Sequence, residues 1–561
     1  MNLKKHVVLF AGIFFCTYLM AQRSSEILSV SASVNQEKAS LAFDKDQRTV
    51  WEVDGKNPKL DQWLMFTLQT PGDVCEMYLQ LQGISKDELK QQMSIFVTYD
   101  PMNLGEPVDY QVQGSARGMR VTFSPKYGAH VKLVFKGNVR VRPFDIKEVS
   151  VFLVDEELKN HKGDKTTLRY MDPRLPVNER VESLLSVMTP EDKMELIREG
   201  WGIPGIPHLY VPPITKVEAV HGFSYGSGAT IFPQALAMGA TWNKNLTEKV
   251  AMAIGEETLA AGTMQAWSPV LDVAQDARWG RCEETFGEDP VLVSQIGGAW
   301  IKGYQSKGLF TTPKHFGGHG APLGGRDSHD IGLSEREMRE IHLVPFRHVI
   351  RNYACQSLMM AYSDFLGVPV AKSKELLRNI LREEWGFDGF VVSDCGAIGV
   401  MNWQHRIVNS LEEAAALGIN SGCDLECGGT YRENLVAAVQ RGLVSEYAID
   451  RALTRVLTMR FKLGEFDPIE LVPYNHYDKK LLAGEQFRRL AYEAAVKSII
   501  LLKNEDNFLP IDKKDVRSIA IVGPFADNNY LGGYSGKPVH NISLLQGVKK
   551  MVGEEVEISY I

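Results

Sequence analysis

The residue best placed for chemistry is Asp394, which ends a short apolar run. Residues 390–393 read Phe-Val-Val-Ser, and Gly396 follows shortly after Asp394. The aromatic and β-branched residues predict a buried strand. In an α/β barrel the reacting groups lie where strands end. A carboxylate in this place suits a nucleophile, a general base or a metal ligand; the alternative is that it only caps the next helix.

Further polar groups follow other predicted strands. Lys314 and His315 come after residues 310–312, and Tyr362 ends the run 357–362. The ammonium and imidazole groups suit hydrogen bonds to hydroxyl groups. The repeated placement of polar residues after strands is typical of the catalytic face of a barrel.

A third group follows the predicted strand 266–270 and reads Arg278-Trp279-Gly280-Arg281. Guanidinium groups beside an aromatic wall suit the recognition of hydroxyl or carboxylate groups. The alternative is a structural salt-bridge network with the glutamates that follow. Three histidines could bind a metal ion, but no clustered acidic motif accompanies them, so we expect neither metal nor other cofactor; they are His315, His319 and His329.

The elements that must position these residues change along the chain. Residues 24–155 alternate in short β-runs and resemble a discoidin-like or carbohydrate-binding jelly roll, a β-sandwich. We expect a linker over 156–170. Helices alternating with short apolar runs then predict a (β/α)8 TIM-like barrel over 171–470. A second linker over 471–497 is expected to lead into an α/β sandwich domain over 498–561, of which only two strands are present.

Composition and the N-terminus limit the function. The chain has 561 residues and a formal net charge of -7, so it lacks the basic excess that nucleic acid binding requires. Residues 1–21 are typical of a secretory signal peptide, which predicts an exported protein, periplasmic or secreted, with no integral membrane domain after its removal. Six cysteines would then remain, and we expect most of them to be buried free thiols.

Four motifs together resemble glycoside hydrolase family 3. They are Arg278-Trp279-Gly280-Arg281, Lys314-His315-Phe316, the run from Trp385 to Asp394, and the run from Ser498 to Asn504. The resemblance implies that Asp394 is the nucleophile of a retaining glycosidase. It also implies that five residues bind the sugar, namely Arg278, Lys314, His315, Tyr362 and Glu218.

The resemblance leaves two sources for the acid/base residue. In the glucosidase and xylosidase branch the acid/base is a Glu of the α/β sandwich domain, and in this protein we expect that residue beyond Ile561. In the N-acetylglucosaminidase branch the acid/base is an Asp-x-His dyad on a barrel loop, and the matching residues here are Asp327 and His329. Residue 317 is glycine where that branch usually has proline, and the interval to Asp327 is longer, so we favour the first source.

We therefore expect a retaining, exo-acting β-glycosidase that binds an oligosaccharide or glycoside. A β-glucoside is the first expected substrate and a β-xyloside the second, although Glu218 is similar to the xylosidase pattern. Two alternatives stay open. One is a β-N-acetylglucosaminidase that uses Asp327 and His329, and the other is a non-catalytic glycan-binding protein.

Overall fold

The structure of the chain is a computed structural model. It describes residues 22–25, 27–33, 38, 42, 51–53, 61–82, 84–98, 104–115, 118–136, 144–154, 168–200, 202–224, 228–321, 323, 329–472 and 479–561. The chain divides into two compact units, residues 1–98 with 102–165, and residues 166–561 with 99–101. The proposed signal peptide and Asp327 lie outside the described residues.

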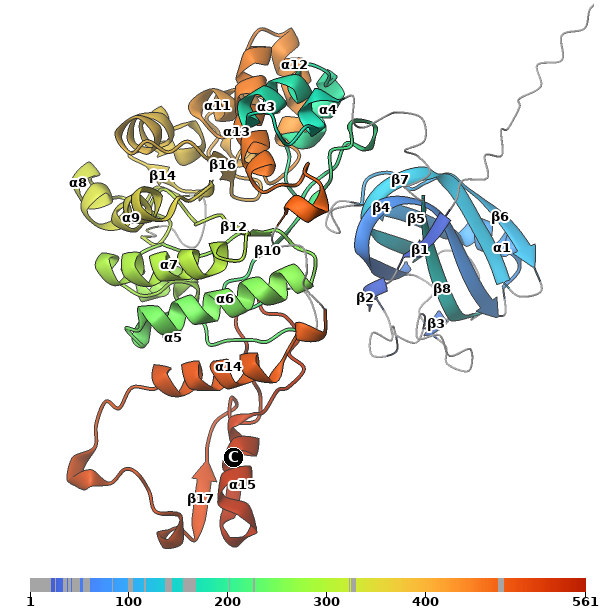
Figure 1. The fold of residues 1–561 in the computed structure, drawn as a ribbon. Coiled ribbons are helices and arrows are strands. Elements are labelled where there is room, and N and C mark those ends of the chain that lie inside the picture. Colours follow the sequence, from blue (N-terminus) through green and yellow to red (C-terminus); the bar gives the residue numbers. More distant parts are fainter. Residues whose placement is uncertain are drawn as a thin grey trace, which may run out of the picture. The chain divides into compact units, whose positions relative to one another are not determined.

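The first unit is an eight-stranded antiparallel sheet around its own apolar core (Figure 1). Along residues 62–68 every second side chain is buried, as the alternating sequence predicts. Register shifts interrupt the pairing of the two longest strands with each other, and each of these strands also pairs with further neighbours along its length. The strands are β1 (Gln22–Ser25), β2 (Ile27–Ala32), β3 (Trp51–Val53), β4 (Gln62–Gln82), β5 (Met93–Thr98), β6 (Tyr110–Ser115), β7 (Gly118–Phe135) and β8 (Phe144–Val154).

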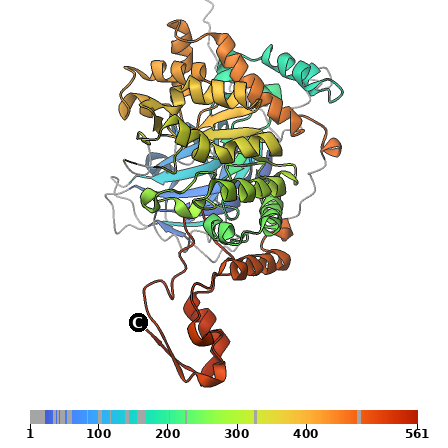
Figure 2. The same ribbon diagram turned by 90° about the vertical axis from the view of Figure 1, so that its left-hand side faces the viewer.

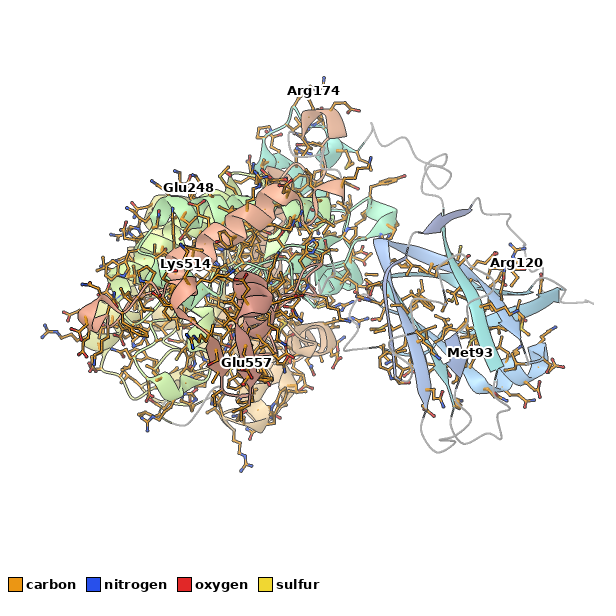
Figure 3. The ribbon with its side chains drawn as sticks, turned by 90° about the horizontal axis from the view of Figure 1, so that it is seen from below. Met93, Arg120, Arg174, Glu248, Lys514 and Glu557 are labelled. Carbon is orange, nitrogen blue, oxygen red and sulfur yellow. A yellow bond between two sulfur atoms is a disulfide. The ribbon has the colours of Figure 1, made fainter. Side chains whose placement is uncertain are left out.

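The strand pairing and the buried core confirm the expected β-structure with an apolar interior. The resemblance of this unit to a discoidin-like module stays a prediction. Met93 is buried in the core, and Arg120 on β7 forms an ion pair of 2.6 Å with Glu76 (Figure 3). A short helix, α1 (Lys86–Gln92), precedes β5 and begins with a capping box at Ser85.

The second unit alternates short strands with helices, as expected. Parallel strands β10, β11 and β12 form one sheet with β9, which runs antiparallel to β10. Strands β13 and β16 form a parallel pair. Single bridges join Phe316 to Met360 and Val392 to Leu425. The bounds are β9 (Gly202–Ile203), β10 (Ile214–Val217), β11 (Gln265–Ala266), β12 (Phe310–Thr311), β13 (Ser357–Met360), β14 (Asp364–Phe365), β15 (Val368–Pro369) and β16 (Phe390–Ser393).

The strands do not form a closed eight-stranded sheet within the described part of the chain. The (β/α)8 expectation is corrected to this extent: strands β9 to β16 are two to four residues long and separate into one four-stranded sheet and two two-stranded sheets, β13 with β16 and β14 with β15. Their parallel direction still brings the carboxyl ends of β10, β11 and β12 to one edge, and those of β13 and β16 likewise.

Helices cover these strands, and α6 and α7 lie side by side (Figure 1). The predicted starts at Thr189 and Ser334 are confirmed, since each is the N-cap of a capping box. The helices are α3 (Val177–Leu185), α4 (Pro190–Leu196), α5 (Ala235–Ala240), α6 (Lys244–Ala260), α7 (Pro290–Gln305), α8 (Glu335–Glu337), α9 (Val344–Tyr353), α10 (Val400–Trp403), α11 (Leu411–Ser421), α12 (Thr430–Gln440) and α13 (Glu446–Lys462), with π-helical turns at Met338–His342 and Glu375–Glu384. No helix among the described residues is long and apolar enough to cross a membrane.

The C-terminal segment follows the last of these helices. Helix α14 (Glu485–Ser498) occupies part of the stretch expected as a linker, and Phe487 and Ala494 on it are buried in the core. Beyond it, β17 (Ser518–Ile521) and β18 (Glu557–Tyr560) form a parallel pair and α15 (Leu544–Val552) connects them (Figure 2). This order agrees with the expected start of an α/β domain.

Candidate active site

Four strand ends place most of the predicted site residues. Glu218 follows β10 directly, and Asp394 follows β16 directly. Lys314 and His315 follow β12, and Tyr362 follows β13. Because these strands run parallel within their sheets, the residues after them gather at the same edge.

Asp394 is a buried carboxylate with 7% of its surface exposed. Its Oδ1 accepts a hydrogen bond from the backbone N–H of Cys395 at 2.7 Å, and its Oδ2 lies 3.5 Å from His315 Nε2. Burial raises the pKa of Asp394 to about 6, while the positive charges of Arg281 and Lys314 oppose the rise. The cations therefore keep the carboxylate available in its ionised form.

Lys314 and Glu218 form a buried ion pair between their side chains. The backbone N–H of Glu218 donates to Ser224 Oγ at 3.1 Å, so Glu218 is held at both its backbone and its carboxylate. The structure thus brings Lys314, Glu218, His315 and Asp394 together as the sequence predicts.

Asp272 holds His315 from the side opposite Asp394. Its Oδ2 lies 2.8 Å from His315 Nδ1 and accepts from the His315 backbone N–H at 3.0 Å. Burial raises the pKa of Asp272 to about 7, against the lowering effects of the His315 N–H and Arg281. Asp272 was not among the predicted site residues, although it follows a predicted strand as they do.

The structure selects the second arginine of the Arg-Trp-Gly-Arg motif. Arg281 is 3% exposed and donates to both carboxylate oxygens of Glu284, at 2.7 and 2.8 Å. The side chain of Arg278 is 90% exposed and pairs with Asp276 instead. The structure therefore does not bring Arg278 into the buried group, and its role as a sugar-binding residue stays a prediction.

Tyr362 lies beside this group and contacts the loop that follows β16. Its hydroxyl donates to the backbone carbonyl of Cys395 at 2.6 Å. Cys395 forms a disulfide with Cys427, a pairing left open by the sequence. Three of the six cysteines after residue 21 are buried free thiols, half of them and not the expected majority, and they are Cys75, Cys355 and Cys423. Cys282 is free and partly exposed.

A tyrosine of the C-terminal segment completes the wall of the site. The ring of Tyr534 lies over Lys314 Nζ, 4.5 Å from the ring centroid, and its hydroxyl lies 3.5 Å from Arg281 Nη2. Its loop is held by Gln234 Nε2, which donates to the Leu531 carbonyl at 2.9 Å. Sequence reasoning missed Tyr534, although the glycines around it marked a tight loop.

The predicted alternative acid/base pair is not assembled in the described residues, since Asp327 lies outside them. His329 is described, and its backbone carbonyl accepts from the Asp364 N–H at 2.8 Å. The dyad stays a prediction. No group of three or more His, Cys, Asp or Glu side chains suited to hold a metal ion occurs in the part of the chain that the structure describes.

We call the buried charged group the pocket cluster, defined as Glu218, Asp272, Arg281, Glu284, Lys314, His315, His319 and Asp394. It offers a rigid carboxylate beside fixed cations and hydrogen-bond donors. That arrangement suits cleavage of a glycosidic bond, in which a carboxylate meets a positively charged sugar in the transition state.

Comparison with known proteins gives the family. The sequence matches the "Glycosyl hydrolase family 3 N terminal domain" over residues 206–459 and the "Glycosyl hydrolase family 3 C-terminal domain" over residues 499–559. The chain belongs to glycoside hydrolase family 3.

Its relatives include both β-xylosidases and β-glucosidases. A β-xylosidase of Formosa agariphila is 37% identical over 68% of this chain and 57% of its own length, and a xylan 1,4-β-xylosidase of Xylanibacter ruminicola is 32% identical over 68% and 47%. A β-glucosidase structure from Erythrobacter marinus superposes with a TM-score of 0.64 at 30% identity, over 71% of this chain and 60% of that one. The chain spans about half the length of the curated relatives it matches.

Proposed function

We propose that this protein is an exo-acting β-glycosidase that retains the configuration of the sugar and uses Asp394 as its nucleophile. The single observation that carries this proposal is the buried position of Asp394 at the end of β16, beside Lys314, Arg281 and His315. Family membership and the names of the relatives support it.

In the proposed reaction Asp394 attacks the anomeric carbon and forms a glycosyl ester, which water then hydrolyses. The buried cations hold Asp394 ionised for the attack. Tyr534 covers Lys314 and Arg281, so it also limits access of water to these cations. Retention requires a second carboxyl or equivalent acid about 5 to 5.5 Å from the nucleophile. We assign that role to the α/β domain, with Asp327 and His329 as the alternative.

For the sugar we propose a β-xyloside ahead of a β-glucoside, which reverses the order expected from the sequence. The curated relatives named above are β-xylosidases, and Glu218 supports the same order. A glutamate is one methylene longer than an aspartate, so it fills space that the hydroxymethyl group of a hexose would need. Lys314 fixes this carboxylate in place.

The test uses the full chain with a panel of aryl β-xylosides, β-glucosides and β-N-acetylglucosaminides. The 2-deoxy-2-fluoro analogue of the preferred sugar should label Asp394, as shown by peptide mass. Asp394→Asn should remove both turnover and label. A label on another residue, or no turnover across the panel, would contradict the proposal, and preference for the N-acetylglucosaminide would favour Asp327 and His329.

A further inference from the structure

The pocket cluster contains more carboxylates than fixed cations. Lys314 pairs with Glu218, and Arg281 pairs with Glu284. Two more buried carboxylates, Asp272 and Asp394, complete the cluster. A buried charge is costly unless a counter-charge compensates it. The protonation state of the His315 ring, which lies between these two carboxylates, therefore sets the net charge of the cluster.

His315 is that ring, and it meets a carboxylate oxygen through each nitrogen. Nδ1 lies 2.8 Å from Asp272 Oδ2, and Nε2 lies 3.5 Å from Asp394 Oδ2. A neutral imidazole carries a proton on one nitrogen only, so one contact would set a lone pair against a carboxylate. An imidazolium carries a proton on both nitrogens, so it donates to Asp272 Oδ2 and presents a positive Nε2–H to the charge of Asp394 Oδ2 at 3.5 Å.

The neighbouring ring, His319, faces a hydrogen-bond donor. His319 packs against His315 with ring centroids 4.7 Å apart, and its Nε2 lies 3.3 Å from Arg281 Nη1. A guanidinium can only donate, so His319 Nε2 is the acceptor in this contact. Of the two adjacent histidines, the contacts therefore favour a positive charge on His315.

We propose that Asp272 is a positioning residue for the glycosidase reaction: it orients His315 and keeps it protonated, so that the Nε2–H group faces Asp394. This inference deepens the proposed function and rests on it. Asp272 contacts both the ring and the backbone N–H of His315, which fixes the position and the orientation of the ring.

Protonation of His315 gives the cluster a suitable charge. Its four carboxylates then face three cations, and a single net negative charge meets the positive charge that develops on the sugar. When Asp394 becomes an ester it loses its charge, and the imidazolium stays paired with Asp272. No proton moves between these residues in the attack, and the proton for the leaving group comes from the separate acid.

Other charged groups around His315 act in both directions. Lys314 and Arg281 add positive charge and disfavour its protonation, whereas Asp272, Asp394 and Glu218 favour it. Burial raises the pKa of both Asp272 and Asp394. The two carboxylates and the His315 ring between them therefore tend to retain one proton near neutral pH. The two-sided contact places that proton on His315.

The experiment measures inactivation of the full chain by a 2,4-dinitrophenyl 2-deoxy-2-fluoro-β-glycoside of the preferred sugar. This leaving group departs without an acid, so the pH dependence of the inactivation rate reports Asp394 and its neighbours. In the wild type we expect an alkaline limb from loss of the His315 proton. In Asp272→Asn the limb should move to lower pH by about one unit or more, with the label still on Asp394.

A matched control separates this effect from lost stability. Asp424 is as buried as Asp272, at 2% exposed, and is held by Arg382 and Arg455 outside the pocket cluster. Asp424→Asn should leave the alkaline limb in place even where it lowers the melting temperature. An unmoved limb in folded Asp272→Asn would overturn the inference.

If Asp272→Asn does not fold, a second variant tests whether the alkaline limb belongs to His315. His315→Gln should abolish the alkaline limb, and adding Asp272→Asn to it should change the rate little, because Asp272 acts through His315. A limb that persists in His315→Gln would overturn the inference. Failure of the wild type to label at Asp394 would instead refute the proposed function, so the two failures are distinguishable.

Discussion

Replacing Arg281 by methionine tests the site more sharply than replacing the predicted Arg278. Arg281 and Glu284 are 3% exposed, and their side chains share two hydrogen bonds. Methionine would leave the Glu284 carboxylate buried without its partner. Breaking a buried pair in this way costs about 3–5 kcal/mol. Arg278→Met should leave the stability unchanged within error, since Arg278 is in solvent.

The same change should alter the pH dependence of catalysis. The Arg281 charge opposes the rise in the pKa of Asp394, which burial has already brought to about 6. Without Arg281 that pKa rises further, and Asp394 is ionised only at higher pH. We expect the acid limb of kcat/KM to move to higher pH by about one unit, and Arg278→Met to leave it in place.

The assay is thermal unfolding together with kcat/KM on an aryl β-xyloside across pH. The double variant Arg281→Met with Glu284→Gln removes the unpaired charge, so it should regain much of the stability while keeping the shifted acid limb. An acid limb that is unchanged in Arg281→Met would refute the electrostatic role. An equal effect of Arg278→Met would refute the assignment of the buried arginine.

Three further changes test other parts of the site. Tyr534→Phe should lower kcat/KM several-fold because the hydroxyl near the buried cations is lost, whereas Tyr530→Phe, in the same loop but 67% exposed, should not; kinetics with both variants checks this. Loss of the disulfide in Cys395→Ala with Cys427→Ala should destabilise the unit by about 2–4 kcal/mol, seen as a lower melting temperature that reductant does not change further. Glu218→Asp should raise the ratio of kcat/KM for β-glucosides over β-xylosides, and a constant ratio would contradict our account of the sugar.

The sequence allowed prediction of the residues that depend on strand ends alone. Asp394, Lys314 and His315 each follow a predicted strand within a few residues, so the direction of the strand carries them to the site. Glu218 follows β10, but it was expected from the family resemblance and not from a predicted strand. This rule needs no knowledge of distant contacts. The closure of the sheet was harder to predict, because strands of two to four residues leave little pattern in the sequence.

The choice between Arg278 and Arg281 could not be made from spacing. A 3-10 turn over Ala277–Trp279 ends at Gly280, whose φ of 85° lies in the left-handed region. Glycine adopts this conformation without steric cost. The turn separates two arginines that are close in sequence, so Arg278 lies in solvent and Arg281 in the core.

Tyr534 was missed because its contacts are remote in sequence, 253 residues from Arg281. Its φ is 54°, which a bulky residue rarely adopts and which tertiary contacts must stabilise. A Cβ atom on the nearby Gly532 would lie 2.0 Å from Gln234 Nε2, so the Gln234 side chain would have to shift from its hydrogen bond to Leu531. The loop is thus shaped to bring the tyrosine to the barrel-like unit.

This loop ties the electrostatics of the site to the C-terminal segment. Tyr534 supplies no charge, yet it covers Lys314 and lies beside Arg281, the two cations that oppose the raised pKa of Asp394. Excluding water from these cations strengthens their field at the carboxylate. The segment that carries β17 and β18 therefore influences the charge state of Asp394, and both family 3 matches along the chain contribute side chains to this part of the structure.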